Sequence, residues 1–201
     1  MNVGVLVSGS GTNLQAILDA GARGQLGQAR VVVVVSNVAG VRALERAEAA
    51  GVATAVLPHR QFPSRQAFDE ALVATLRAQG VELVALAGFM RIVTPAFLQA
   101  FPQRVINVHP ALLPAFPGIH AQKQALEYGA RITGCSVHFV DEGCDTGPII
   151  MQAAVPVLDG DDEAALTARI LVEEHRLYPA AIRALADGRV TVDGRRVTVR
   201  P

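Results

Sequence analysis

The feature that most constrains the fold is an apolar run at residues 2–7 that ends in a glycine-rich turn. Three valines and a leucine leave this run without a polar face, so both of its faces must be covered. Strands of this kind are typical of a parallel sheet with helices on both sides. From Leu14 onward the apolar spacing becomes helical. The chain is therefore predicted to begin as strand, turn and helix.

The same alternation of strand-like and helical segments continues along the chain. Strands are expected at residues 31–35, 53–57, 82–87 and 105–108, with helices at 41–50 and 64–79 and a short helix opened by Thr94 and Pro95. A helix at 122–128, strands at 133–140 and 148–155, a long helix at 163–186 and a hairpin with an Asp-Gly type I′ turn at 189–199 follow. This order predicts an α/β fold, with a doubly wound, mostly parallel sheet flanked by helices and a C-terminal β-hairpin.

Length and charge limit the class of protein. The 201 residues fit a single domain, and no linker interrupts them. Eighteen basic and eighteen acidic residues cancel without forming a dense cluster, which argues against a nucleic-acid-binding surface. Because the chain shows neither a signal peptide nor a membrane-spanning run, a cytoplasmic protein is expected. Its two cysteines form no Cys-x-x-Cys motif, which disfavours a disulfide framework and a thiolate zinc site.

The turn at residues 8–15 is a candidate phosphate site. Gly9 and Gly11 permit close backbone approach, Thr12 or Asn13 can cap the helix, and amides at a helix N-terminus favour an anion. The dinucleotide fingerprint is not met, because its third glycine is replaced by Leu14 and the second strand ends without an acid. The nucleotide P-loop lysine is also absent. A site for one phosphate monoester remains, and the alternative is a plain glycine turn that caps a helix.

The stretch at residues 105–118 is the candidate reactive centre. Asn107 and His109 are two residues apart on a predicted strand, so their side chains project to the same face. Ligands of open α/β sheets bind at the carboxyl ends of strands, where His109 lies. Pro110 and two further prolines then restrict the loop. The alternative is a pair of polar residues that only closes a loop.

Four motifs in the same order carry a resemblance to a known family. They lie at residues 8–15, 87–92, 107–118 and 134–148. Together they resemble the phosphoribosylglycinamide formyltransferases, purine biosynthetic enzymes that use 10-formyltetrahydrofolate. The similarity extends from Met1 to about the end of the long helix. It implies one formyltransferase domain over 1–201, with a phosphate-binding half at about 1–100, a folate and catalytic half at about 101–187, and a hairpin at 188–201.

The resemblance also implies roles for individual residues. The catalytic residues would be Asn107, His109 and Asp145, with His138 as a possible supporting residue behind them. Substrate-binding residues would be Gly11, Thr12, Asn13, Pro110 and Glu174. The folate would contact Arg65, Met90, Arg91, Ile92, Val93, Asn107, Val140, Asp141 and Asp145. Two positions depart from the family pattern, Ala111 in place of a frequent serine and Leu171 in place of a polar phosphate contact.

The implied reaction explains why these residue types are needed. A neutral amine attacks an N-formyl carbon and forms a tetrahedral oxyanion. The Asn107 amide can donate to that oxyanion, and His109 can move a proton near neutral pH. Asp145 is expected to raise the pKa of His109 and to orient its ring. No metal is required.

Several alternatives remain open from the sequence alone. Formyltetrahydrofolate hydrolysis, or transfer to methionyl-tRNA, would use the same Asn, His and Asp set, although those relatives usually carry a further domain. A metal-dependent hydrolase would use His109, His138 and Asp145 as ligands. A non-catalytic module would bind the phosphorylated ligand without turnover. The expected partners are small-molecule substrates, with neither nucleic acid nor membrane, and the expected state is a monomer or homodimer.

Overall fold

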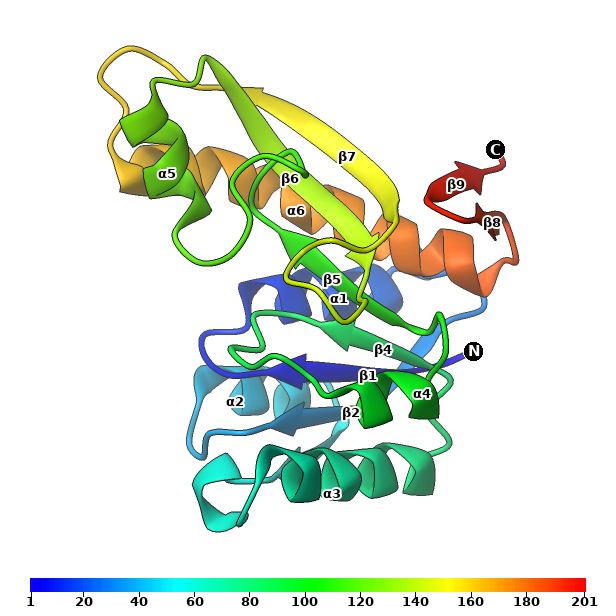
Figure 1. Ribbon diagram of the computed structural model, residues 1–201. Helices are drawn as coiled ribbons and strands as arrows, with labels where there is room; N and C mark the ends of the chain where they lie inside the picture. The colour runs from blue at the N-terminus through cyan, green and yellow to red at the C-terminus, as the bar shows by residue number, and fades with distance from the viewer.

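A seven-stranded sheet forms the centre of the molecule (Figure 1). The structure, a computed structural model, describes residues 1–201. The strands lie in the order β3-β2-β1-β4-β5-β6-β7. The first five are parallel, whereas β6 and β7 are antiparallel additions beside β5. The strands are β1 (Asn2–Val7), β2 (Arg30–Ser36), β3 (Ala53–Val56), β4 (Leu83–Leu86), β5 (Val105–His109), β6 (Ile132–Phe139) and β7 (Ile149–Pro156).

Helices cover both faces of this sheet, as the doubly wound prediction requires. One core cluster joins alternate β1 residues such as Val3 and Val5 to α1, α2, α5 and α6. The other joins Leu6, on the opposite face, to α3 and α4. This division explains why β1 has no polar face. The helices are α1 (Thr12–Ala22), α2 (Arg42–Ala49), α3 (Arg65–Ala78), α4 (Pro95–Ala100), α5 (Ala121–Tyr128) and α6 (Glu163–Ala186), with a 3₁₀ turn at His59–Gln61.

Side-chain caps fix several helix starts where the sequence predicted them. The Ser64 hydroxyl accepts from the Ala67 amide at 3.1 Å, and Asp162 accepts from the Ala165 amide at 2.7 Å. The prediction that Thr12 or Asn13 caps α1 is wrong. Gly11 occupies the N-cap with a φ of 72° and no side chain bonds the first turn, so Thr12 and Asn13 lie inside the helix.

The C-terminal hairpin consists of β8 (Val190–Asp193) and β9 (Arg196–Val199). Its predicted type I′ turn centred on Asp-Gly is wrong, because Asp193 pairs with Arg196 and leaves Gly194 and Arg195 as the turn. Only Gly194 has positive φ, which fits a type II′ turn rather than a type I′ turn. The Arg195 Nη2 donates to the Thr146 carbonyl at 2.9 Å, so the hairpin contacts the loop after β6.

Tyr178 joins α6 to the centre of the sheet through its hydroxyl group. Its side chain is fully buried, and its hydroxyl lies 3.0 Å from the Leu86 carbonyl and 3.1 Å from the Ile106 carbonyl. Leu86 is the last residue of β4, and Ile106 lies in β5 one residue before Asn107. No helix of the fold has both the length and the apolar character needed to cross a membrane.

Candidate active site

Four polar side chains meet where β5, β6 and the following loop come together. Asn107 and His109 lie on β5, and His138 lies on β6 directly opposite Asn107 in the antiparallel register. Asp145 comes from the loop between β6 and β7 and approaches both histidines, at 3.3 Å from His109 and 3.6 Å from His138. The structure therefore brings the three predicted catalytic residues and His138 into one cluster.

Both ring nitrogens of His109 have a defined environment. Nε2 lies 2.8 Å from the Phe116 carbonyl, which can only accept, so Nε2 carries a proton. Nδ1 lies 3.3 Å from Asp145 Oδ2. The ring gains or releases its second proton at Nδ1, in front of a carboxylate, while the loop carbonyl holds the ring in place.

The pKa of His109 differs in direction from the sequence-based expectation. Burial lowers the pKa, whereas the Phe116 carbonyl and the Asp145 charge raise it. The net result is a lowered pKa, because the side chain is only 4% exposed and desolvation outweighs the nearby carboxylate. Asp145 therefore raises the pKa of His109 as expected, but by less than burial lowers it. The neutral imidazole, which can accept a proton, is favoured at pH 7.

Asp145 is held by its neighbours in an uncommon backbone conformation. Its φ of 55° lies in the left-handed region, which aspartate tolerates better than most residues. The Gly118 amide donates to its Oδ2 at 2.8 Å. Burial opposes ionisation of this carboxyl, but the hydrogen bonds from His138 and Gly118 and the charges of both histidines outweigh it and lower the pKa to about 2. Asp145 is thus a fixed negative charge beside His109.

His138 links Asn107 to the same carboxylate. Its Nδ1 lies 2.8 Å from the Phe139 carbonyl and therefore carries a proton. Its Nε2 lies 3.3 Å from the Asn107 Nδ2 and faces Asp145. Nε2 therefore lies between a donor, the Asn107 amide, and an acceptor, the Asp145 carboxylate. His138 thus connects the carboxamide to the carboxylate.

The predicted phosphate residues meet at the start of α1. No side chain caps this helix, so the amides of its first turn are free of a competing side-chain acceptor. The Asn13 Nδ2 donates to Glu174 Oε2 at 2.7 Å, which brings α6 to the turn. Glu174 is buried, and burial raises its pKa although the Asn13 hydrogen bond partly lowers it. Asn13 Oδ1 is buried without a hydrogen-bond partner.

The predicted folate residues line the segment after β4. Met90 and Ile92 are 73% and 62% exposed, unusually high for large apolar side chains. Arg65 Nη2 donates to the Ile92 carbonyl at 2.8 Å, and the Arg91 guanidinium lies 4.9 Å from the centre of the Phe68 ring. Val93 differs from its neighbours because its side chain is buried in the core beside α3 and α4. Only its backbone is available to a ligand.

Three further predicted residues border the cluster. Pro110 directly follows His109 and is half-buried. The Val140 amide donates to the Val105 carbonyl at 2.9 Å, which extends the β5–β6 pairing. Asp141 accepts from the Thr146 hydroxyl at 2.6 Å and from the Gly143 amide at 3.2 Å. Asp141 therefore orders the loop that carries Asp145.

Sequence reasoning missed the backbone groups that complete the cluster. The Phe116 carbonyl and the Gly118 amide hold His109 and Asp145, and neither residue type indicates such a role. The only sequence signal was the proline-rich loop around them. Ser136 adds a further support, because its hydroxyl lies 2.7 Å from the Ala111 carbonyl and 3.0 Å from the Leu113 amide.

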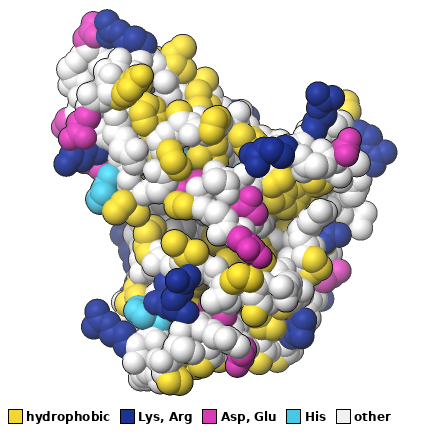
Figure 2. Space-filling view, in the orientation of Figure 1, with side chains coloured by type: hydrophobic (Ala, Val, Ile, Leu, Met, Phe, Trp, Pro, Cys, Tyr) yellow, Lys and Arg dark blue, Asp and Glu magenta, His cyan; other side chains and the backbone are white.

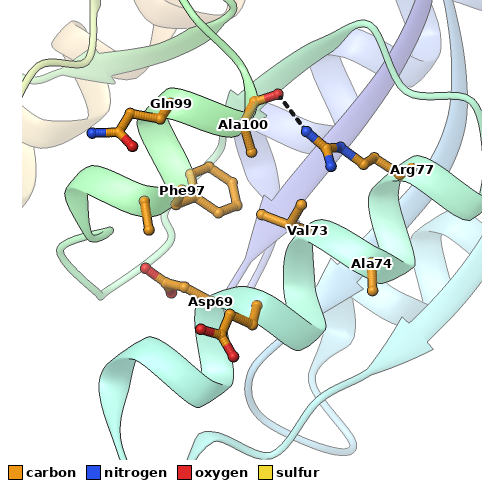
Figure 3. Close-up of a pocket in the computed structure, with 9 residues that line it drawn as sticks. Asp69, Val73, Ala74, Arg77, Phe97, Gln99 and Ala100 are labelled. Carbon is orange, nitrogen blue, oxygen red and sulfur yellow. Dashed lines mark hydrogen bonds between the residues drawn. The ribbon is translucent and has the colours of Figure 1, made fainter.

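Other surface features lie apart from this cluster. A recess of about 460 Å³ between α3 and α4 contains none of the predicted site residues (Figure 3). Within it, Arg77 donates to the Ala100 carbonyl at 3.4 Å. Basic and acidic side chains are scattered over the visible face (Figure 2). No group of three or more His, Cys, Asp and Glu side chains is arranged to hold a metal ion.

Fold and cluster define a doubly wound α/β protein with titratable groups at the carboxyl edge of its sheet. The protein-family model described as "Formyl transferase" matches residues 1–182. The chain belongs to the formyl transferase family. This membership implies a formyl donor.

Individual relatives agree with this family. The chain is 47% identical to the phosphoribosylglycinamide formyltransferase of Escherichia coli (strain K12) over 190 residues, covering 94% of this chain and 89% of the relative. A solved structure, glycinamide ribonucleotide transformylase 1 from Symbiobacterium toebii, superposes with a TM-score of 0.97 at 56% identity and covers 99% of this chain and 93% of that one. The predicted resemblance and fold class are confirmed.

Some relatives are much longer than this chain. The trifunctional purine biosynthetic protein adenosine-3 of Drosophila pseudoobscura pseudoobscura is 53% identical over 187 residues, which are 92% of this chain and 14% of that protein. The chain therefore spans about a seventh of the length of these relatives.

Proposed function

We propose that this chain transfers the formyl group of 10-formyltetrahydrofolate to the amino group of 5′-phosphoribosylglycinamide. The products are the N-formyl ribonucleotide and tetrahydrofolate, in the route to purine nucleotides. The observation that carries this proposal is that His109 and His138 both face the Asp145 carboxylate while Asn107 contacts His138. That cluster supplies a hydrogen-bond donor, a proton acceptor and a fixed charge within one space.

The ribonucleotide would lie between the glycine turn and the cluster. The amides of Gly11, Thr12 and Asn13 would bind its phosphate, because helix N-termini favour anions. Glu174 would accept from the ribose hydroxyls, and Pro110 would border the amine. Leu171 offers no polar contact, so the backbone amides and Asn13 would carry phosphate recognition.

The formyl donor would bind beside the segment after β4. Met90 and Ile92 present apolar surface to a ring system, and Arg65 and Arg91 present positive charge to a carboxylated tail. The backbone of Val93 and the segment containing Val140 and Asp141 would form the other side. Asn107 and Asp145 would then lie next to the transferable carbon.

The reaction needs one bond made, one bond broken and one proton moved. The amine nitrogen attacks the formyl carbon, and the Asn107 amide donates to the oxyanion that forms. Loss of such a donor typically costs about 3 kcal/mol of transition-state stabilisation. His109 Nδ1 accepts the surplus proton of the attacking nitrogen, and the Asp145 charge stabilises the imidazolium. The proton reaches the folate nitrogen as its bond to the formyl carbon breaks.

The decisive test is an assay of formyl transfer with purified protein, the ribonucleotide and 10-formyltetrahydrofolate. Stoichiometric formation of the N-formyl ribonucleotide and tetrahydrofolate supports the proposal. Release of formate with water as the only acceptor would favour the hydrolase alternative, and ribonucleotide binding without turnover would favour the binding module. Metal analysis of the same sample tests the metal-dependent alternative. The three-part division of the chain, its cytoplasmic location and its state as monomer or homodimer stay predictions.

A further inference from the structure

Arg46 of α2 lies directly behind the glycine turn. Its Nε donates to the Ser10 carbonyl at 2.9 Å, and its Nη1 donates to the Gln15 side-chain carbonyl at 2.8 Å. No Asp or Glu forms an ion pair with it. Arg46 is connected to a carboxylate only indirectly, because the Gln15 amide donates to the exposed Asp19. Arg46 is therefore a half-buried, uncompensated positive charge held by neutral groups.

The turn and α2 are locked together around this arginine. The Ala43 amide donates to the Gly9 carbonyl at 3.1 Å. A Cβ at Gly11 would lie 2.7 Å from the Ala43 Cβ, 2.9 Å from the Ala43 Cα and 3.5 Å from the Arg46 Cδ. These contacts leave no room for a side chain at Gly11. They also place the arginine stem beside the residue that begins α1.

The bond to Ser10 fixes the direction of the next amide. The Ser10–Gly11 peptide is planar, and in a trans peptide the C=O and the N–H point in opposite directions. Because Arg46 holds the Ser10 carbonyl, the Gly11 amide points away from α2. This amide is one of those proposed to bind the phosphate. Without Arg46 the Ser10 carbonyl would lose the hydrogen bond that fixes this peptide plane.

We propose that Arg46 is a positioning residue for recognition of the substrate phosphate. It orients the Ser10–Gly11 peptide and adds a positive charge behind the amides, without contacting the phosphate itself. The inference rests on the proposed function and deepens it, because it assigns phosphate selectivity to a residue outside the four motifs. A charge in this position acts on a phosphate dianion and has little effect on a neutral group.

The test compares Arg46→Gln with Arg42→Gln, a matched control on the same helix. Arg42 is exposed and makes no side-chain hydrogen bond or ion pair, so its substitution removes the same charge without touching the turn. Arg46→Gln should raise the KM for the ribonucleotide about tenfold and leave kcat and the KM for 10-formyltetrahydrofolate unchanged. Arg42→Gln should change none of these values. An equal rise in both variants would overturn the proposal.

A substrate without phosphate separates recognition from general damage. With the dephosphorylated glycinamide riboside, kcat/KM should be the same for wild type and Arg46→Gln. A parallel loss for both substrates would mean that Arg46 only supports the fold, and the proposal would be wrong. Arg46→Lys keeps the charge but cannot make the two-pronged contact, so its KM should lie between wild type and Arg46→Gln.

Binding of inorganic phosphate tests Arg46 independently of turnover. Titration calorimetry should give a dissociation constant about tenfold weaker for Arg46→Gln than for wild type and for Arg42→Gln. If wild type transfers no formyl group but this difference appears, the proposed activity fails and the phosphate role stands. If formyl transfer proceeds and phosphate binds all three proteins equally, the role of Arg46 fails alone.

Discussion

The glycine turn and the polar cluster lie at the same edge of the sheet but are built in different ways. The turn is local, formed by consecutive residues that pack beside α2 and whose first helical amides have no side-chain cap. The cluster is assembled from β5, β6 and a loop, with Asp145 lying 36 positions after His109. A backbone site tolerates many side chains but depends on conformation, whereas the cluster depends on side-chain identity. Substitutions should therefore separate binding from chemistry.

The largest effect is expected from the side chains of the cluster. His109→Ala and Asp145→Asn should each lower kcat about a thousandfold, since a positioned proton-transfer group typically contributes that much. The dissociation constant for the ribonucleotide, measured by calorimetry, should stay within about twofold, because the phosphate amides are unchanged. Loss of binding in proportion to kcat would show that these residues are structural.

A substitution that disturbs the backbone of the turn should weaken ribonucleotide binding and leave the chemical step nearly unchanged. Gly11→Ala combines a left-handed backbone, which costs about 1–2 kcal/mol for residues with a Cβ, with contact against Ala43. The KM for the ribonucleotide should rise at least about tenfold, while kcat at saturation changes little. Gly51→Ala is the matched control, because Gly51 has a similar φ of +69° and no atom near the added Cβ. A rise in KM for both variants would refute a local effect.

The pH dependence should reveal the balance between burial and charge at His109. Because its pKa is lowered, activity should fall only as the pH drops below the ordinary histidine value of 6.5. Asp145→Asn removes a charge that raises this pKa, so the His109 titration should move to still lower pH. NMR titration of the ring protons measures both proteins without activity. A shift to higher pH in the variant would contradict the assignment.

The same carboxylate makes a pH-dependent contribution to stability. The folded-state pKa of Asp145, about 2, lies below the ordinary value of 3.8, so its contribution is present above 3.8 and lost as pH falls toward 2. The difference in free energy of unfolding between wild type and Asp145→Asn should therefore shrink as the pH falls from 3.8 toward 2. Denaturant unfolding at a series of pH values measures the difference. A constant difference between pH 7 and pH 2 would exclude this linkage.

The smallest effect is expected at Glu174, which α6 brings to the glycine turn. Burial raises the pKa of Glu174, so the carboxylate destabilises the fold as pH rises through that pKa. Glu174→Gln keeps an acceptor for Asn13 and should stabilise the protein at pH 7 by at most about 1 kcal/mol. The KM for the ribonucleotide should rise about fivefold, because a hydrogen bond to ribose is worth about 1 kcal/mol. Chemical denaturation and steady-state kinetics check both values.

The contrast between the two regions also explains what the sequence could predict. The turn was predictable because its residues are consecutive. The pairing of Asn107 with His109 was predictable because both side chains project from one face of a strand. Asp145 entered only through the family resemblance, since its position depends on the β5–β6 register and on a left-handed backbone. The direction of the His109 pKa shift was wrong because burial cannot be weighed from residue types. Arg46 gave no signal, since its partners are a backbone carbonyl and an amide.

The position of Tyr178 has a consequence for the choice of acceptor. It lies one helical turn after Glu174, so a single helix sets the distance between the first turn of α1 and the adjacent strands β4 and β5. An acceptor lengthened by one methylene between sugar and amine would have to leave either the phosphate amides or His109. Such homologues should bind yet react slowly, because a displacement of about 1 Å can cost a hundredfold in rate. Molecular length, as well as charge, would then distinguish substrates from mere ligands.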